Sequence, residues 1–107
     1  MVYAIMLKLK EGKTFEPGVI QRHVEHLRSL DDNGRLVICG PFKDGKGGML
    51  VVRAQSQEEA EGMAKRDPFI AEGFEDYEVR ELVAANRNNN YLLDAKVQES
   101  RTAPRDL

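Results

Sequence analysis

The 107-residue sequence lacks several features that would point to a familiar class of protein. Its single cysteine, Cys39, excludes an internal disulfide and a cluster of cysteine ligands, and it favours a reducing, cytoplasmic location. There is no tryptophan, and no apolar run approaches the roughly 18 residues that a membrane-spanning helix needs. The first apolar run, residues 2–7, is too short for a signal peptide and has no basic leader, so we expect no export.

The sequence also lacks an excess of charge of one sign. Sixteen Lys and Arg residues stand against 18 Asp and Glu residues, which gives a net charge of -2. Such a chain offers no basic surface to a phosphate backbone, so nucleic acid is not an expected partner. Hydrophobic residues make up 41% and charged residues 32%, which suits a modest core with a well-solvated surface. The length corresponds to one domain.

Hydrophobic periodicity predicts six elements before residue 84. Strands are indicated by apolar residues that alternate or run together, and helices by apolar residues that recur at three- and four-residue steps. The second helix is expected to begin with a capping box, in which the Ser56 hydroxyl and the Glu59 carboxylate satisfy free backbone donors of the first turn. The predicted order is strand, helix, strand, strand, helix, strand, over residues 2–9, 19–33, 35–40, 49–54, 56–67 and 75–83.

This βαββαβ order predicts an α+β, ferredoxin-like fold, an antiparallel four-stranded sheet with two helices on one face. The first three strands carry apolar residues on both faces, so the second face also needs a cover. We therefore expect a homodimer in which two sheets pack face to face as a dimeric α/β barrel with clefts near the element ends. The domain is expected over residues 1–83.

Residues 84–107 are expected to form a C-terminal tail. The tail begins with an asparagine-rich stretch and continues with an apolar patch at residues 91–93. Either this tail is disordered, or residues 91–97 form a short helix that docks on the protein's own domain or on that of a partner. Docking is favoured, because apolar side chains are costly to leave in water.

Two histidines lie on the first predicted helix. The apolar residues of this helix form a stripe that is expected to pack into the core: Val19, Ile20, Val24, Leu27 and Leu30. His23 follows Ile20 by three residues and precedes Leu27 by four, roughly 30° from the centre of this stripe at about 100° per residue. By the same arithmetic His26 lies roughly 90° from that centre, at the helix flank or in solvent. His23 is either a core histidine satisfied by a local hydrogen bond or a group that exchanges protons. The pair is not expected to bind a metal, because a third ligand at a diagnostic spacing is missing.

Asp67 is the second candidate for a functional site. Two interpretations stay open: its carboxylate bonds to local backbone in an Asp-Pro turn, or it approaches a residue of the neighbouring helix and orients an imidazole. The segment 45–48, Gly-Lys-Gly-Gly, precedes a strand rather than a helix, so it is expected to be a hairpin loop and not a phosphate site. Cys39 is expected to be a buried structural thiol.

Several motifs share the spacing of a known family. They are His23, the segment 32–36 (Asp-Asn-Gly-Arg-Leu), Gly40-Pro41, the segment 56–60, Asp67-Pro68-Phe69 and Gly73. Over roughly residues 1–82 the chain resembles the YciI-like, or YCII-related domain, family. The loop after Gly40-Pro41 is shorter than in the family, and the tail extends beyond the usual domain end.

The resemblance implies a ferredoxin-like fold, dimers that form α/β barrels, and a relationship to a dehydrochlorinase that eliminates chloride from a chlorinated hydroxyhydroquinone. It also implies that His23 and Asp67 correspond to the family's proposed active-site histidine and aspartate. The resemblance selects His23 over His26, because His23 is the histidine that precedes the Gly-Arg-Leu segment by eleven residues. The helix wheel selects the same residue independently.

These observations lead to competing hypotheses about function. In the first, the protein is a lyase or isomerase without a cofactor, and His23, oriented by Asp67, moves a proton on a hydroxylated aromatic or similar polar ring. In the second, the same cleft of a non-catalytic dimer binds or senses a small ligand. In the third, the dimer is purely structural and His23 lies in a dry core.

Overall fold

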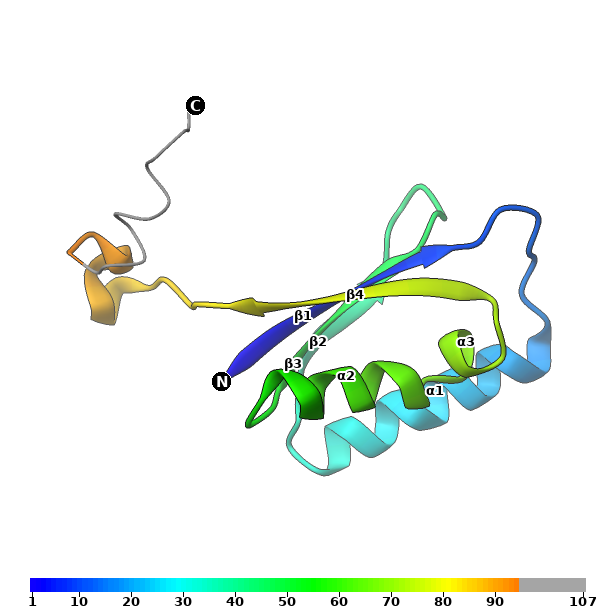
Figure 1. Ribbon diagram of the computed structural model, residues 1–107, viewed down its shortest axis with the longest axis horizontal. Coiled ribbons are helices and arrows are strands. Elements are labelled where there is room, and N and C mark those ends of the chain that lie inside the picture. Colours follow the sequence, from blue (N-terminus) through cyan, green and yellow to red (C-terminus); the bar gives the residue numbers. More distant parts are fainter. Residues whose placement is uncertain (95–107) are drawn as a thin grey trace.

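The computed structural model describes residues 1–94, which form a four-stranded antiparallel sheet with its helices on one face (Figure 1). The strand order is β2-β3-β1-β4. This arrangement confirms the predicted ferredoxin-like α+β fold. The elements are β1 Val2–Leu9, α1 Pro17–Asp32, β2 Leu36–Pro41, β3 Gly48–Arg53, α2 Gln57–Arg66, α3 Pro68–Ala71, β4 Glu75–Leu82 and the 3-10 helix η1 Arg87–Leu92.

The core lies between the sheet and the helix layer. On β1, Tyr3, Ile5 and Leu7 alternate with more exposed residues and point toward the helices, as the period of two requires. Val52 and Leu50 of β3 lie opposite Tyr3 and Ile5 in the register and share their face. Burial of each such side chain contributes roughly 1.5–3 kcal/mol to stability. The buried residues of α2 are Ala60, Met63 and Ala64, and the two small alanines allow that helix to pack closely on the sheet.

Helix α1 packs less completely than its sequence predicts. It begins at Pro17 rather than at Val19, because a proline suits the first helical turn, where no backbone N–H is needed. Val19 is fully buried, but Ile20 and Val24 are 42% and 40% exposed. The expectation that the whole apolar stripe packs into the core is therefore wrong: part of it forms the wall of a cavity.

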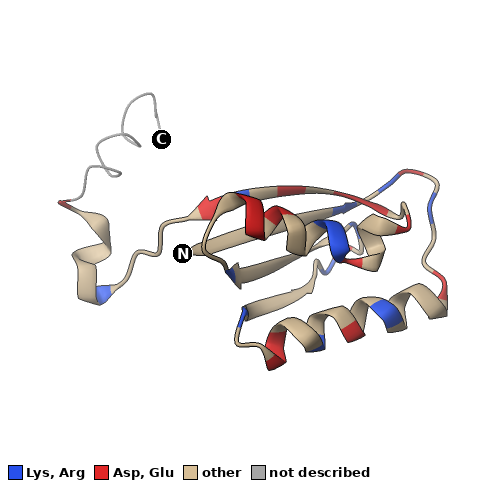
Figure 2. Ribbon diagram, turned by 60° about the horizontal axis from the view of Figure 1, so that its bottom comes forward, with Lys and Arg blue, Asp and Glu red and all other residues tan. Residues whose placement is uncertain are grey.

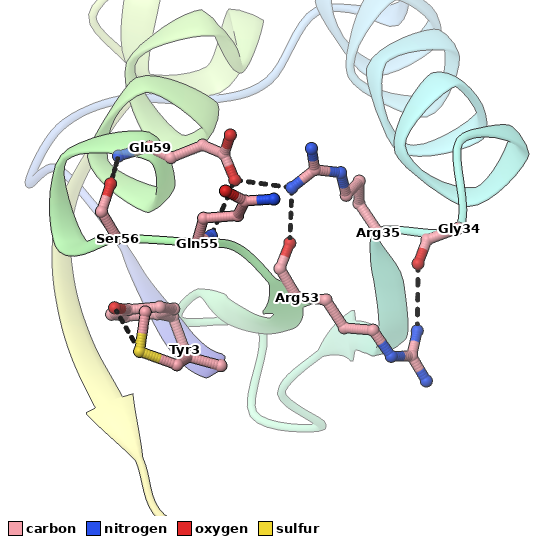
Figure 3. Close-up of polar contacts among 8 residues, drawn as sticks. Tyr3, Gly34, Arg35, Arg53, Gln55, Ser56 and Glu59 are labelled. Carbon is pink, nitrogen blue, oxygen red and sulfur yellow. Dashed lines mark hydrogen bonds and ion pairs between the residues drawn. The ribbon is translucent and has the colours of Figure 1, made fainter.

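Polar contacts hold the start of α2 against the ends of β2 and β3 (Figure 3). The Ser56 hydroxyl accepts a hydrogen bond from the Glu59 backbone N–H at 3.0 Å, as predicted for an N-cap. The reciprocal half of the predicted capping box is wrong, because Glu59 Oε1 accepts from the Gln55 backbone N–H and from the Arg35 guanidinium instead. The carboxylate thereby ties the helix start to β2.

The segment before β3 is the hairpin loop that its sequence predicts, since β2 and β3 pair antiparallel on either side of it. Gly47 has a φ of 126° and lies directly against β1. A Cβ atom at this position would overlap the Leu7 carbonyl oxygen, so only glycine fits. The loop rests on the central strand and closes one side of the cavity described below.

The sheet face opposite the helices is uncovered in the described chain (Figure 1). It carries apolar side chains, among them Ile38, which is 63% exposed, and Leu82. After β4 the chain leaves the domain and η1 stands apart from it (Figure 1). Tyr91 and Leu92 have left-handed φ angles, so the predicted helix does not begin at Tyr91, and residues 95–97 lie outside the described residues.

Charges of both signs alternate along the outer side of α1 (Figure 2). This surface provides no single-sign patch for a strongly charged partner. In the part of the chain that the structure describes, no helix is long and apolar enough to cross a membrane.

Candidate active site

His23 of α1 and Asp67, between α2 and α3, are in direct contact. The His23 Nδ1 atom lies 2.8 Å from Asp67 Oδ1 and 3.0 Å from Oδ2. Both side chains are well shielded, with exposed fractions of 13% for His23 and 1% for Asp67. The helices lie side by side on the sheet, which brings together two residues that are 44 positions apart in the sequence.

The local structure around Asp67 explains why its carboxylate is fixed. Asp67 ends α2 and is the N-cap of α3, a short helix that the sequence did not predict. Its Oδ1 atom accepts a hydrogen bond from the Phe69 backbone N–H at 2.9 Å, and Pro68 occupies the first helical position. The structure therefore contains both of the contacts that the sequence left open for Asp67. Its carboxylate caps the turn and also contacts the imidazole of His23.

The His23 ring is also held through its face. Phe69 stacks on it with 3.8 Å between ring centroids and 10° between planes, and Phe15 stacks on the outer face of Phe69. An ion pair between Arg22 and Glu72, with nitrogen–oxygen distances of 2.7 and 2.8 Å, ties α1 to the end of α3. The Asp67-Pro68-Phe69 segment thus fixes the imidazole at one nitrogen and across one face.

The His23 ring forms part of the wall of a cavity of about 480 Å³ between α1, the sheet and the hairpin loop. Apolar side chains dominate the wall, including Phe15, Ile20, Val24 and Leu27. Small-molecule sites typically combine such a wall with a few polar groups that fix the ligand. Within the described part of the chain, three polar side chains line this one: His23, Glu75 and Cys39.

Glu75, the first residue of β4, is a site residue that the sequence analysis missed. It is 4% exposed, and burial first and the Asp67 carboxylate second raise its pKa to about 7, while His23 lowers it. In the sequence Glu75 opens a predicted strand and is followed by Asp76, which gives it the pattern of an exposed edge. The strand register indicates that Glu75 is buried, since it lies opposite Leu9 on the helix-facing side of β1.

His26 lies outside this cavity, in a second, more polar hollow between α1 and α2. It is at the helix flank, as predicted, but it is half-buried and not in solvent. Its Nε2 atom is buried and makes no hydrogen bond to the described residues, and burial lowers its pKa. Asp67 Oδ1 and Oδ2 bind His23 and not His26.

Cys39 is half-buried and lines the cavity, so it is less enclosed than predicted. Burial, and to a smaller degree the Asp31 carboxylate, raise the pKa of its thiol. The thiol form, which is a poor nucleophile, therefore predominates near neutral pH. Within residues 1–94, His, Cys, Asp and Glu side chains form no group of three or more that could hold a metal ion.

Two solved structures share this fold. The chain is similar to 5-chloro-2-hydroxyhydroquinone dehydrochlorinase (TftG) from Burkholderia phenoliruptrix AC1100, solved in complex with 2,5-dihydroxybenzoquinone. The TM-score is 0.61 and the identity 23%, over 84% of this chain and all of that one. Muconolactone isomerase is similar with a TM-score of 0.64 and 15% identity, over 81% of this chain and 93% of that one. At these identities the comparison supports the fold.

A relative by sequence is the uncharacterized protein YjpA from Bacillus subtilis strain 168. It is 31% identical over 80 residues, which cover 75% of this chain and 94% of the relative. The model of the YCII-related domain matches residues 1–83, which include every residue of the cavity described above. The chain therefore belongs to the YCII-related domain family.

Proposed function

We propose that this protein is a cofactor-independent lyase or isomerase of small ring compounds, in which His23 moves a proton and Asp67 orients it. One observation carries the proposal: the contact of 2.8 Å between His23 Nδ1 and Asp67 Oδ1 at the wall of a largely apolar cavity. A histidine held in this way is a suitable general base and acid.

In this proposal the two ring nitrogens of His23 have different roles. A carboxylate accepts a hydrogen bond, so Asp67 selects the tautomer in which Nδ1 carries the proton. The lone pair of Nε2 is then free to remove a proton from a ligand in the cavity. The imidazolium that results is stabilised by the buried Asp67 carboxylate, and it returns the proton to another atom of the substrate in the second half of the reaction.

The cavity wall supports a small, mostly apolar substrate. Aromatic residues Phe15 and Phe69 and aliphatic residues of α1 suit a flat ring, and the few polar groups suit oxygen substituents. The two structural neighbours are named for a chlorinated hydroxyhydroquinone and for muconolactone, which are small oxygenated rings. These names favour the same substrate class for this chain.

The proposal includes a homodimer formed by the open sheet face. Ile38 and Leu82 expose apolar surface there, and a second copy of the same sheet would cover it. Light scattering should therefore give the dimer mass at micromolar concentration, and Ile38→Glu should give the monomer mass. A monomer in the unmodified protein would refute the dimer.

A substrate panel in D2O tests the proposed reaction. Muconolactone and 5-chloro-2-hydroxyhydroquinone are suitable members, with product formation and deuterium incorporation followed by NMR. We expect the wild-type protein to convert or deuterate at least one ring compound, and His23→Gln to lose this activity while keeping the wild-type melting temperature. Equal activity in His23→Gln would contradict the proposal.

A non-catalytic ligand-binding dimer is the second candidate, and the apolar cavity favours it as much as it favours catalysis. A thermal-shift screen against phenols, lactones and small acids separates the two, because a ligand that binds only the folded state raises the melting temperature. Binding without conversion or deuterium incorporation across the panel would favour the binding protein.

A further inference from the structure

Glu75 has an unusual environment for a charged residue. It is 4% exposed, its Oε1 atom is buried, and this atom makes no hydrogen bond to any residue in the range 1–94. Buried polar atoms in native proteins nearly always have a partner, and a missing one costs stability. Glu75 also lines the same cavity as His23, so the missing partner can come from a ligand in that cavity.

The surroundings of Glu75 favour its neutral form. Burial penalises the carboxylate, and the nearby carboxylate of Asp67 repels a second negative charge. His23 is the one neighbour that favours ionisation, and it is already bound to Asp67. Among residues 1–94, none of those that line the cavity is a lysine or arginine. Glu75 therefore has a carboxylic acid O–H to donate below about pH 7.

We propose that Glu75 is a further functional residue of this site, which donates a hydrogen bond to a carbonyl oxygen of the ligand. The inference rests on the proposed function for its catalytic consequence and extends it by naming the substrate class: a ring compound that bears a carbonyl group and a proton on the adjacent carbon. The described residues of the cavity wall supply no lysine or arginine to pair with a dianion, which disfavours a phosphate ligand.

The proposed reaction of such a ligand uses both His23 and Glu75. His23 Nε2 takes the proton from the carbon next to the carbonyl, the electron pair of the C–H bond forms a carbon–carbon double bond, and the carbonyl π pair moves onto oxygen. Glu75 stabilises this enolate by its hydrogen bond, as a carboxylic acid kept neutral by an apolar site does. Where a further ring double bond extends the enolate to a dienolate, the His23 imidazolium returns its proton to the far carbon, which is isomerisation. Where the carbon beta to the carbonyl bears a leaving group, that group departs with its electron pair and the imidazolium gives its proton to the leaving group or to solvent, which is elimination.

Two matched probes test the hydrogen bond without requiring turnover. Acetophenone and α-methylstyrene have nearly the same shape and differ in the exchange of a carbonyl oxygen for a methylene group. Affinities for both should be measured by NMR titration of the wild-type protein near pH 6. We expect acetophenone to bind about tenfold more tightly, a ratio typical of one hydrogen bond to a buried donor.

Variants at position 75 identify the donor. Glu75→Met, which fills similar space without a donor, should remove the preference for acetophenone, and Glu75→Gln should retain it because the amide N–H₂ donates. His23→Gln should keep the preference, so a failure of the proposed acid–base role leaves this result unaffected. An equal affinity of the wild-type protein for both probes, or a preference that survives in Glu75→Met, would overturn the inference.

A second measurement needs no ligand. The ¹³C chemical shift of the Glu75 carboxyl should titrate with a pKa of about 7. A titration at the ordinary glutamate pKa of 4.5 would overturn the inference even if neither probe binds.

Discussion

His23 and His26 lie three positions apart on the same helix, yet they occupy very different surroundings. His23 has a carboxylate at Nδ1, an aromatic ring on its face and a cavity beside it. His26 has a buried Nε2 that makes no hydrogen bond to residues 1–94, and it lies in a separate polar hollow. The difference comes from the Asp67-Pro68-Phe69 segment, whose carboxylate and phenyl ring both contact the His23 imidazole. The residue type supplies the imidazole, and its neighbours decide whether it can serve as an acid–base group.

The largest expected effect comes from replacing each histidine by glutamine. His23→Gln should lower kcat on the substrate identified from the panel by about 10²- to 10⁴-fold, the usual contribution of a positioned general base or acid. His26→Gln should leave kcat unchanged, because this side chain does not line the cavity and is not the histidine that Asp67 binds. Steady-state kinetics of the two variants measures the difference directly. An equal loss in both would remove the distinction between them.

The contributions of Glu75 and His26 to the free energy of unfolding should change with pH in opposite directions. The pKa of Glu75 is raised from 4.5 to about 7, so its contribution to stability is fully present below pH 4.5 and is lost as the pH rises to about 7. This loss amounts to about 3 kcal/mol for a shift of this size. The pKa of His26 is lowered from 6.5, so its contribution is present above pH 6.5 and is lost as the pH falls through its folded value.

Urea unfolding between about pH 4 and pH 8 checks these slopes. Glu75→Gln should flatten the loss toward neutral pH, and His26→Gln should flatten the loss toward acid. Each variant serves as the control for the other. An unchanged pH profile in Glu75→Gln would show that its carboxyl group does not titrate in this window.

Two variants at position 67 should have smaller effects, and they separate the capping of α3 by Asp67 from its contact with His23. Asp67→Ala should lower the free energy of unfolding by about 1–2 kcal/mol, because it removes the N-cap of α3 and leaves the Phe69 N–H unsatisfied. Asp67→Asn should keep most of this stability, since asparagine also caps helices. Both variants should lose activity, because neither provides a carboxylate to stabilise the imidazolium of His23. Full activity in Asp67→Asn would mean that the charge of Asp67 is dispensable.

The smallest effect is expected at the polar end of the helix layer shown in Figure 3. Ser56→Ala removes the hydroxyl that caps α2 and should lower the free energy of unfolding by about 1 kcal/mol. Activity should not change, because Ser56 does not line the cavity. A loss of activity larger than the loss of stability would mean that the two ends of the helix layer are coupled.

The fold followed from the sequence because its signals are local. Alternating apolar residues, the Ser56 cap and the stop at Pro68 each act within a few positions, and their order leaves few topologies. The same signals predicted that Ile20 and Val24 pack into the core, and this prediction is wrong. An apolar stripe on a helix has the same sequence pattern whether it faces a packed core or a cavity.

The candidate site was predicted only in part, since it depends on contacts between distant residues. The position of His23 on the inner stripe selected His23, and the family resemblance selected both His23 and Asp67. Glu75 was missed because its burial depends on strand register and on how α2 and α3 pack against β4. The catalytic role of these residues, the homodimer, the docking of the tail and a cytoplasmic location stay predictions.

The tautomer of His23 tests the central claim most directly. In ¹⁵N NMR spectra of the imidazole groups near neutral pH, the account predicts that His23 carries its proton on Nδ1, with Nε2 unprotonated, and that Asp67→Ala abolishes this preference. The opposite tautomer in the wild-type protein, with the proton on Nε2, would contradict the account, because no base would then face the cavity.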